Sequence, residues 1–313
     1  MSNNGDLWVE IFRPHNFDDG LFIGQEAIVN SCRNYIINGT YPHLILSGPA
    51  GTGKTTTALI LADTISGPGN TMILNASDDN RIEIFRNKIK DWIKVIGEFP
   101  DIYKTLILDE GDNISKPAQQ ILRRMLEEHS AYFRLIITCN YPNKIIDPIF
   151  SRCVHMRYKK LPNNLVLKRI YTMTKKKKLK ISTRDLKRIV LIFGGDMRRC
   201  INILNAIYMG SDIDALLTRQ NPLTFIKCLS NGSIPKLKKY IDNNIYSETD
   251  TKYVLERCID ILTTNFNTTF LEKINLTEDK TKDLLKLLTE GEYRLASGSQ
   301  YYSALFWIYL NFK

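Results

Sequence analysis

The chain has 313 residues, 43% hydrophobic and 24% charged, with a formal net charge of +10. These values are typical of a globular protein with two or three domains and room for a large core. No apolar run is long enough to span a membrane, the first residues lack a signal-peptide core, and the six scattered cysteines lack metal-ligand spacing.

The positive charge favours a polyanionic partner such as nucleic acid, although a lysine-rich composition alone would give the same number. The cysteines are most simply reduced thiols of an intracellular protein. We therefore expect no membrane and no secretion.

Residues 7–23, near the start of the chain, are rich in aromatic and apolar side chains. Pro14 blocks a continuous helix there and favours extended backbone at Arg13. These side chains either pack on a flat ring such as adenine or simply dock on the core, and on the first reading Val9, Arg13 and Pro14 bind the nucleotide. A helix is predicted from about Gln25 to Asn38.

A phosphate-binding loop is predicted between an apolar strand, 44–47, and a helix beginning near residue 56. Its residues are Gly48, Pro49, Ala50, Gly51, Thr52, Gly53, Lys54 and Thr55, followed by Thr56. Glycines let successive N–H groups turn toward phosphate oxygens, and the helix adds its positive end. Lys54 would reach the β- and γ-phosphates of ATP, and the Thr55 hydroxyl would bind Mg²⁺.

A second strand is predicted at 71–75, followed by a turn and an amphipathic helix from Arg81 to Ile96. The polar face of this helix carries Arg81, Arg86 and Lys90. Such a face is ordinarily solvated, but it can also contact phosphates, and we name these residues with Lys116 as candidate DNA contacts.

A strand at 104–108 leads into the carboxylates Asp109 and Glu110. In a parallel sheet, ligands bind beyond the carboxyl ends of the strands. Asp109 would therefore face the Mg²⁺ ion held by Thr55, and Glu110 would orient a water and accept its proton.

Ser115 is predicted to cap a helix ending near Glu128, and strands are predicted at 133–140 and 154–158. Asn140, at the end of the first of these strands, either bonds the γ-phosphate or is a turn residue. Arg152 lies on a helical turn between the strands.

The chain is predicted to be helical after residue 161. We expect a nucleotide-binding α/β domain at 1–158, a helical lid at 159–218 and an all-α collar at 219–313. Gly291 and Gly298 are predicted to separate the last helices. The last helix, 299–311, is apolar nearly all round, and we favour a subunit contact over a purely internal role.

The chain resembles the small subunits of replication factor C, the sliding-clamp loader of the AAA+ class. The resemblance covers the first two thirds of the chain well. In the last third it rests only on the predicted run of helices. It rests on the phosphate loop, Asp109-Glu110, Asn140-Tyr141, Ser151-Arg152-Cys153 and Gly195-Asp196-Met197-Arg198-Arg199.

The resemblance implies an α/β P-loop AAA+ ATPase core, a parallel sheet flanked by helices, followed by a helical lid and collar. It implies that Asn140 and Arg198 sense the γ-phosphate, and that Arg152 acts in trans on ATP held by a neighbour in a hetero-pentameric ring. The implied partners are the other loader subunits, a sliding clamp and primer–template DNA. In the family, an Arg-Gly pair usually follows the Ser-Asp-Asp/Glu turn, and its arginine touches the DNA backbone. Here the pair is Asn80-Arg81, so the resemblance does not carry this DNA contact over directly.

Two other functions stay open at this stage. The chain could be a different AAA+ DNA motor, of the branch-migration helicase type, or a nucleotide-binding scaffold that lends Arg152 to other subunits. The expected compartment is the nucleus in a eukaryotic cell, and otherwise the cytoplasm or a viral replication compartment.

Overall fold

The computed structural model describes residues 7–77, 88–94, 103–218, 222–245, 247–264, 271–272 and 274–312. The chain divides into two compact units. The first contains residues 1–173 and 195–202, and the second contains residues 174–194 and 203–313. The three-domain division at residues 158 and 218 stays a prediction.

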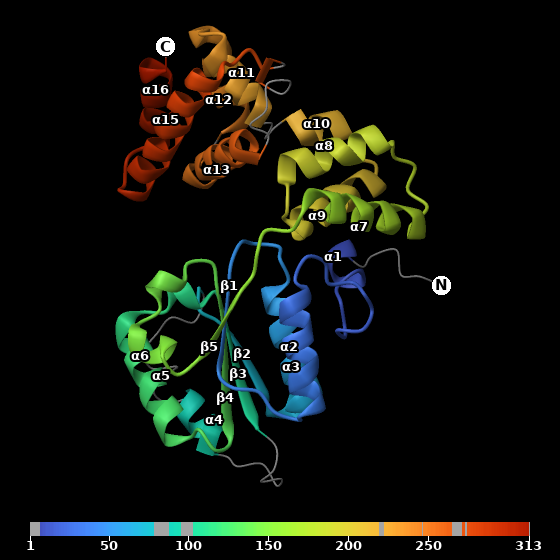
Figure 1. Ribbon diagram of the computed structural model, residues 1–313, viewed down its shortest axis with the longest axis vertical. Helices are drawn as coiled ribbons and strands as arrows, with labels where there is room; N and C mark the ends of the chain where they lie inside the picture. The colour runs from blue at the N-terminus through green and yellow to red at the C-terminus, as the bar shows by residue number, and fades with distance from the viewer. Residues whose placement is uncertain are drawn as a thin grey trace. The chain divides into compact units, whose positions relative to one another are not determined.

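The first unit is built on a parallel sheet (Figure 1), and the strand order of this sheet is β2-β3-β4-β1-β5. The strands are β1 (Leu44–Ser47), β2 (Thr71–Asn75), β3 (Lys104–Asp109), β4 (Phe133–Cys139) and β5 (Val154–Arg157). Ser47 pairs with Cys139 and Leu108 with Ile137, so the carboxyl ends of β1, β3 and β4 lie side by side. This arrangement confirms the predicted sheet.

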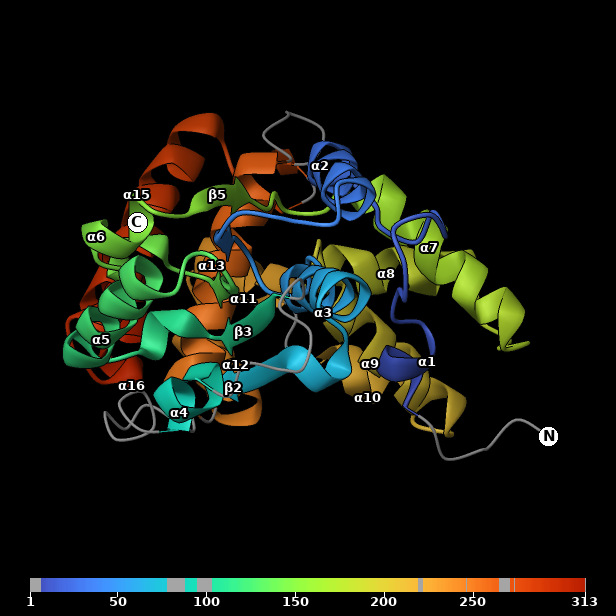
Figure 2. The same cartoon turned by 90° about the horizontal axis from the view of Figure 1, so that it is seen from below.

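Helices cover both faces of this sheet, α2 (Glu26–Ile37) and α3 (Lys54–Ile65) on one side and α5 (Lys116–Glu128) on the other (Figure 2). Successive side chains of a strand point to opposite faces. Leu44 and Leu46 accordingly pack with the α2–α3 layer, whereas Ile45 packs in the α5 layer. Burial on both faces explains why the strands are continuous apolar runs.

The other elements that begin in the first unit are short, apart from the helices α7 and α9. They are α1 (Trp8–Ile11), η1 (Pro68–Asn70), α4 (Lys90–Lys94), η3 (Gly111–Asn113), η4 (Pro142–Lys144), α6 (Asp147–Phe150), α7 (Asn163–Lys176) and α9 (Met197–Tyr208). Most of the helix predicted from Arg81 to Ile96 lies outside the described residues. Its described end contains α4, where Ile89 and Ile93 are buried as predicted.

The second unit is helical in its described residues. Its helices are α8 (Thr183–Phe193), α10 (Ile213–Thr218), α11 (Pro222–Ser230), α12 (Ile234–Asn244), α13 (Glu248–Thr264), α15 (Glu278–Ala296) and α16 (Tyr301–Asn311). Leu255, Leu284, Leu288 and Leu305 are fully buried in one apolar cluster. α13 also joins α8, because Arg257 donates to the carbonyls of Leu191 and Ile192 at 2.7 and 2.8 Å.

Gly291 does not separate two helices, and that prediction is wrong. It lies inside α15, where an added Cβ would come within 2.6 Å of Ile308 Cδ1 on α16. The glycine lets α16 approach closely, a tertiary requirement that outweighs its poor helix propensity. α16 itself places Ala304, Leu305 and Ile308 in the core, and the predicted subunit contact stays a prediction.

Candidate nucleotide-binding site

The phosphate loop connects β1 to α3 at the carboxyl edge of the sheet, as its sequence predicts. Gly48, Gly51 and Gly53 all have positive φ, and Gly53 directly precedes the first residue of α3. The N–H groups at the start of this helix are free of intrahelical partners. The loop therefore ends at a helix N-terminus suited to an anion.

The side chain of Lys54 folds back over the loop. Its ammonium donates to the carbonyls of Gly48 and Pro49 at 2.7 and 2.8 Å, and to Asn140 Oδ1 at 3.0 Å. Burial lowers the pKa of Lys54, whose exposed fraction is only 8%. The ammonium is thus held by neutral oxygens, at a point where phosphate would supply the missing negative charge.

The end of β3 joins the loop through Asp109. Thr55 Oγ1 donates to Asp109 Oδ1 at 2.8 Å, and the Thr138 hydroxyl of β4 donates to the same oxygen. The structure thus brings together the hydroxyl and the carboxylate that the sequence pairs at a metal site. Thr138 was missed, although it is a polar residue near the end of an apolar strand.

Glu110 has a left-handed backbone with φ of 55°, which is uncommon for a residue other than glycine. Its N–H lies 3.3 Å from Thr138 Oγ1, and its carboxylate accepts from the Ser77 hydroxyl. Glu110 lines the same pocket as Lys54, Thr55 and Asp109. Such backbone conformations gather at active sites, where they direct a side chain that regular structure would turn away.

The pocket also has an apolar wall. Val9, Arg13 and Pro14 line it, and their binding to a nucleotide stays a prediction. Phe12 and Phe22, from the aromatic and apolar stretch between 7 and 23, line it too, as do Leu161, Met173 and Ile201, which the sequence did not indicate. Aromatic and aliphatic side chains opposite a phosphate loop fit the flat, weakly polar face of a nucleotide base.

α9 begins directly on the phosphate loop. The Met197 N–H donates to the Gly51 carbonyl at 3.2 Å, and the Asp196 carboxylate accepts the Arg199 N–H at 3.1 Å. A Cβ on Gly51 would come within 1.9 Å of Asp196 Oδ1, so this approach requires glycine. It brings Arg198 to the pocket lining.

Arg152 lies outside the residues that line this pocket. Its guanidinium donates to the Pro148 carbonyl at 2.7 Å and to the Glu127 carboxylate of α5. Both side chains are more than a third exposed. The arginine is therefore available at the surface rather than used by its own pocket.

The candidate DNA contacts remain untested. Lys90 and Lys116 are exposed at the starts of α4 and α5, whereas Arg81 and Arg86 lie outside the described residues. Cys139 lines the pocket, but burial raises its pKa to about 12 and Asp112 adds to the shift, so its thiol is no nucleophile. The described residues contain no cluster of metal-binding side chains of the His, Cys and carboxylate kind.

Comparison with known proteins identifies the family. Residues 44–161 match the model named ATPase family associated with various cellular activities (AAA). A replication factor C small subunit of Picrophilus torridus is 33% identical over 304 residues, covering 94% of this chain and 92% of that one. The chain belongs to the replication factor C small-subunit family.

Further matches agree with this assignment. A replication factor C small subunit of Archaeoglobus fulgidus is 38% identical over 218 residues, covering 68% of this chain and 67% of that one. The RuvB Holliday junction branch migration motor of Thermotoga maritima superposes with a TM-score of 0.54 at 16% identity, covering 92% and 91% of the two chains. The second likeness shows the AAA+ fold alone. In the part of the chain that the structure describes, every helix is too short or too polar to span a bilayer.

Proposed function

We propose that this chain is a clamp-loader subunit, which binds and hydrolyses ATP to help place a ring-shaped sliding clamp on primer–template DNA. Membership of the replication factor C small-subunit family supports ATPase activity in general. One observation supports the proposal most. Lys54, Thr55, Asp109 and Glu110 lie together in one pocket at the edge of the sheet, and Arg152 lies outside the lining of that pocket.

In this proposal the loop N–H groups and Lys54 hold the phosphates of ATP. Thr55 and Asp109 would hold Mg²⁺, because a hydroxyl and a carboxylate 2.8 Å apart are the hard oxygen ligands that this ion prefers. The ion would offset negative charge on the phosphates. Glu110 orients the attacking water and takes its proton, while Asn140 and Arg198 contact the γ-phosphate.

The position of Arg152 favours assembly of the chain into a ring of subunits. A hydrolysis site of this class needs a cation at the transferred phosphoryl group, and an arginine supplied there raises the rate by about 10³–10⁵. Arg152 is more than a third exposed and lies outside its own pocket lining. It would complete the site of a neighbouring subunit, in a hetero-pentamer that includes other loader subunits.

Replacing Glu110 by Gln tests the proposal. The variant keeps the side chain's size but removes the base, so it should bind ATP as tightly as the original chain while turnover in the assembled loader falls at least a hundredfold. The wild-type chain should show low turnover alone and stimulation by partners, clamp and DNA. Normal turnover by the Glu110→Gln variant would refute the assignment.

Two further variants separate the alternatives. If the chain is a non-catalytic scaffold, Lys54→Ala leaves clamp loading intact, whereas the proposal predicts its loss. If it is a branch-migration motor, the isolated chain separates strands without a clamp. The proposal predicts no strand separation.

A further inference from the structure

The excess positive charge of the molecule is concentrated in one segment. Residues 159–218 contain fourteen Lys and Arg but only four Asp and no Glu, a net charge of +10. The other 253 residues contain 29 basic and 29 acidic side chains and are neutral overall. A lysine-rich composition would spread the charge along the chain, so composition alone does not explain this pattern.

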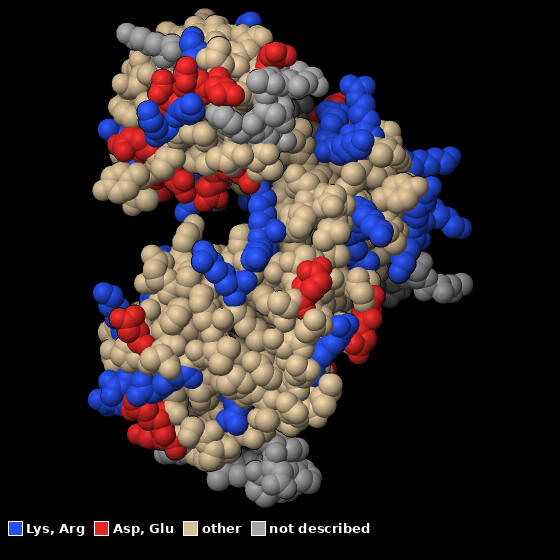
Figure 3. Space-filling model, in the orientation of Figure 1, with Lys and Arg blue, Asp and Glu red and all other residues tan. Residues whose placement is uncertain are grey.

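Part of this charge lies on a patch where α7 turns into α8. The patch consists of Lys176, Lys177, Lys178, Lys180, Arg184 and Lys187, of which all but the partly buried Lys177 are exposed. Figure 3 shows Lys and Arg side chains gathered over this turn. The ion pairs described beside the patch belong to Arg188 and not to any of these six side chains. We call this set the α7–α8 basic patch.

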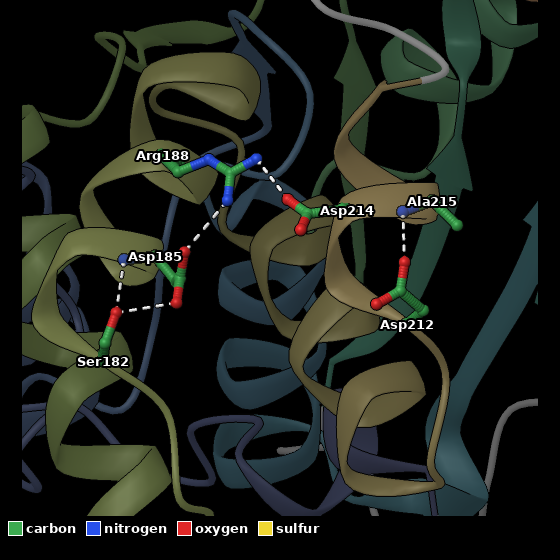
Figure 4. Close-up of polar contacts among 6 residues, drawn as sticks. All are labelled: Ser182, Asp185, Arg188, Asp212, Asp214 and Ala215. Atoms are coloured by element: carbon green, nitrogen blue, oxygen red, sulfur yellow. Dashed lines mark hydrogen bonds and ion pairs between the residues drawn. The ribbon is translucent and has the colours of Figure 1, made fainter.

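The acidic side chains beside the patch already make contacts within the protein. Arg188 bridges Asp185 and Asp214 at 3.0 and 2.7 Å, linking α8 to α10 (Figure 4). Asp185 also accepts from the Ser182 hydroxyl at 2.7 Å in the predicted capping box, and Asp212 accepts the Ala215 N–H at 2.7 Å. Each acid therefore serves an internal contact.

Helix stability does not account for the whole patch. A lysine in the last turn of a helix, as Lys176 is in α7, is stabilised by the helix dipole. Arg184 lies in the first turn of α8, where the dipole disfavours a cation. These neighbouring cations repel one another, although Arg184 is also attracted to the Asp185 carboxylate, and a polyanion would relieve the repulsion.

We infer that the α7–α8 basic patch is a second nucleic-acid surface, which binds the phosphate backbone without reading sequence. Five of the six side chains are lysines, which act as point charges on flexible stems rather than as planar forks for base edges. An anionic membrane is disfavoured, because the apolar residues Leu186, Ile189 and Val190 of α8 are buried and leave no face to insert. The patch shares no residue with the candidate DNA contacts Arg81, Arg86, Lys90 and Lys116 or with the ATP site.

The test uses the isolated chain without nucleotide, and a labelled 30-base-pair duplex as probe. The variant Lys176→Gln, Lys178→Gln, Lys180→Gln removes three charges from the patch. The matched control, Lys280→Gln, Lys282→Gln, Lys286→Gln, removes three exposed lysines from α15, two of them paired with Asp279 and Asp283. A third variant replaces the three patch lysines by Arg and keeps the charge.

Each phosphate contact contributes about 0.9 to the slope of log affinity against log salt concentration. The patch variant should therefore show a slope smaller by about 3 and an affinity lower by at least about tenfold near 50 mM salt. The α15 control and the Arg variant should bind like the original chain, on duplexes of different sequence. The result should be the same in the Lys54→Ala background, which separates this surface from the proposed ATPase function.

Equal losses in the patch variant and the α15 control would overturn the inference, because net charge alone would then set the affinity. Unchanged binding in the patch variant would also overturn it. So would binding of the patch to vesicles of anionic phospholipid without binding to the duplex.

Discussion

Arg152 and Glu127 form an ion pair on the surface of the first unit, outside the residues that line the nucleotide pocket. Glu127 also accepts from Arg123 Nε at 3.2 Å, and these arginines lower its pKa, Arg123 the more strongly. The carboxylate therefore stays charged and restrains the guanidinium that the proposed function assigns to a neighbouring site.

Replacing Glu127 by Gln should loosen Arg152 and reduce the partner-stimulated ATPase of the assembled loader by about three- to tenfold. The stability of the chain should hardly change, because exposed ion pairs contribute little. Glu128→Gln is the matched control, since that neighbouring residue contacts only His129 among the ion pairs described, at 3.8 Å. Equal stimulated rates for both variants and the original would contradict this role of Glu127.

Replacing Gly51 by Ala should lower nucleotide affinity by at least tenfold, because the new Cβ would displace Asp196 and the start of α9 from the loop. Gly67→Ala is the control. Gly67 has a similar positive φ of 76° against 68°, but nothing lies within 4 Å of an added Cβ. Both variants carry about 1 kcal/mol of backbone strain, so titration calorimetry isolates the clash. Equal affinities would show that the contact with α9 is irrelevant to binding.

Replacing Arg257 by Met should destabilise the second unit by about 2–4 kcal/mol. The guanidinium is buried, pairs with Asp260 and satisfies two carbonyls at the end of α8, which the variant leaves without donors. Lys286→Met, the control, breaks an exposed pair with Asp283 at 3.3 Å and should cost little. Urea unfolding of both variants measures the difference, and similar midpoints would argue against the α8–α13 link.

Acid should destabilise the first unit through His43. Burial, with Arg134 nearby, lowers its pKa from 6.5 to about 4, and its Nδ1 accepts the Leu135 N–H at 3.2 Å. Below pH 6.5 this histidine is therefore protonated in the unfolded chain, whereas in the folded chain it stays neutral down to about pH 4. The free energy of unfolding therefore falls as the pH falls below 6.5. The loss is at most about 1.4 kcal/mol per pH unit, and it should be smaller here because the ring is partly exposed. His43→Gln should flatten the profile between pH 6.5 and 5, and an identical slope in that variant would exclude His43 as the cause.

The sequence predicts the centre of the site well because its parts are local. The loop at 48–55 and the acids at the end of β3 are short motifs tied to strand ends, and parallel strands bring such ends together. Part of the apolar wall was missed, because Leu161, Met173 and Ile201 come from segments far along the chain from the loop and follow no local motif. Gly291 was misread for a similar reason, since only the packing of Ile308 shows why a helix holds a glycine there.

The most direct test of the ring mechanism combines two assays of Arg152→Ala. The account predicts that the isolated variant binds ATP within about twofold of the original chain, while ATP turnover by the assembled loader falls by about 10³-fold at the neighbouring site. Lys54→Ala calibrates the loss of binding expected from a residue of the chain's own pocket. Loss of ATP affinity in the isolated Arg152→Ala chain, or full turnover by the loader that contains it, would contradict the account.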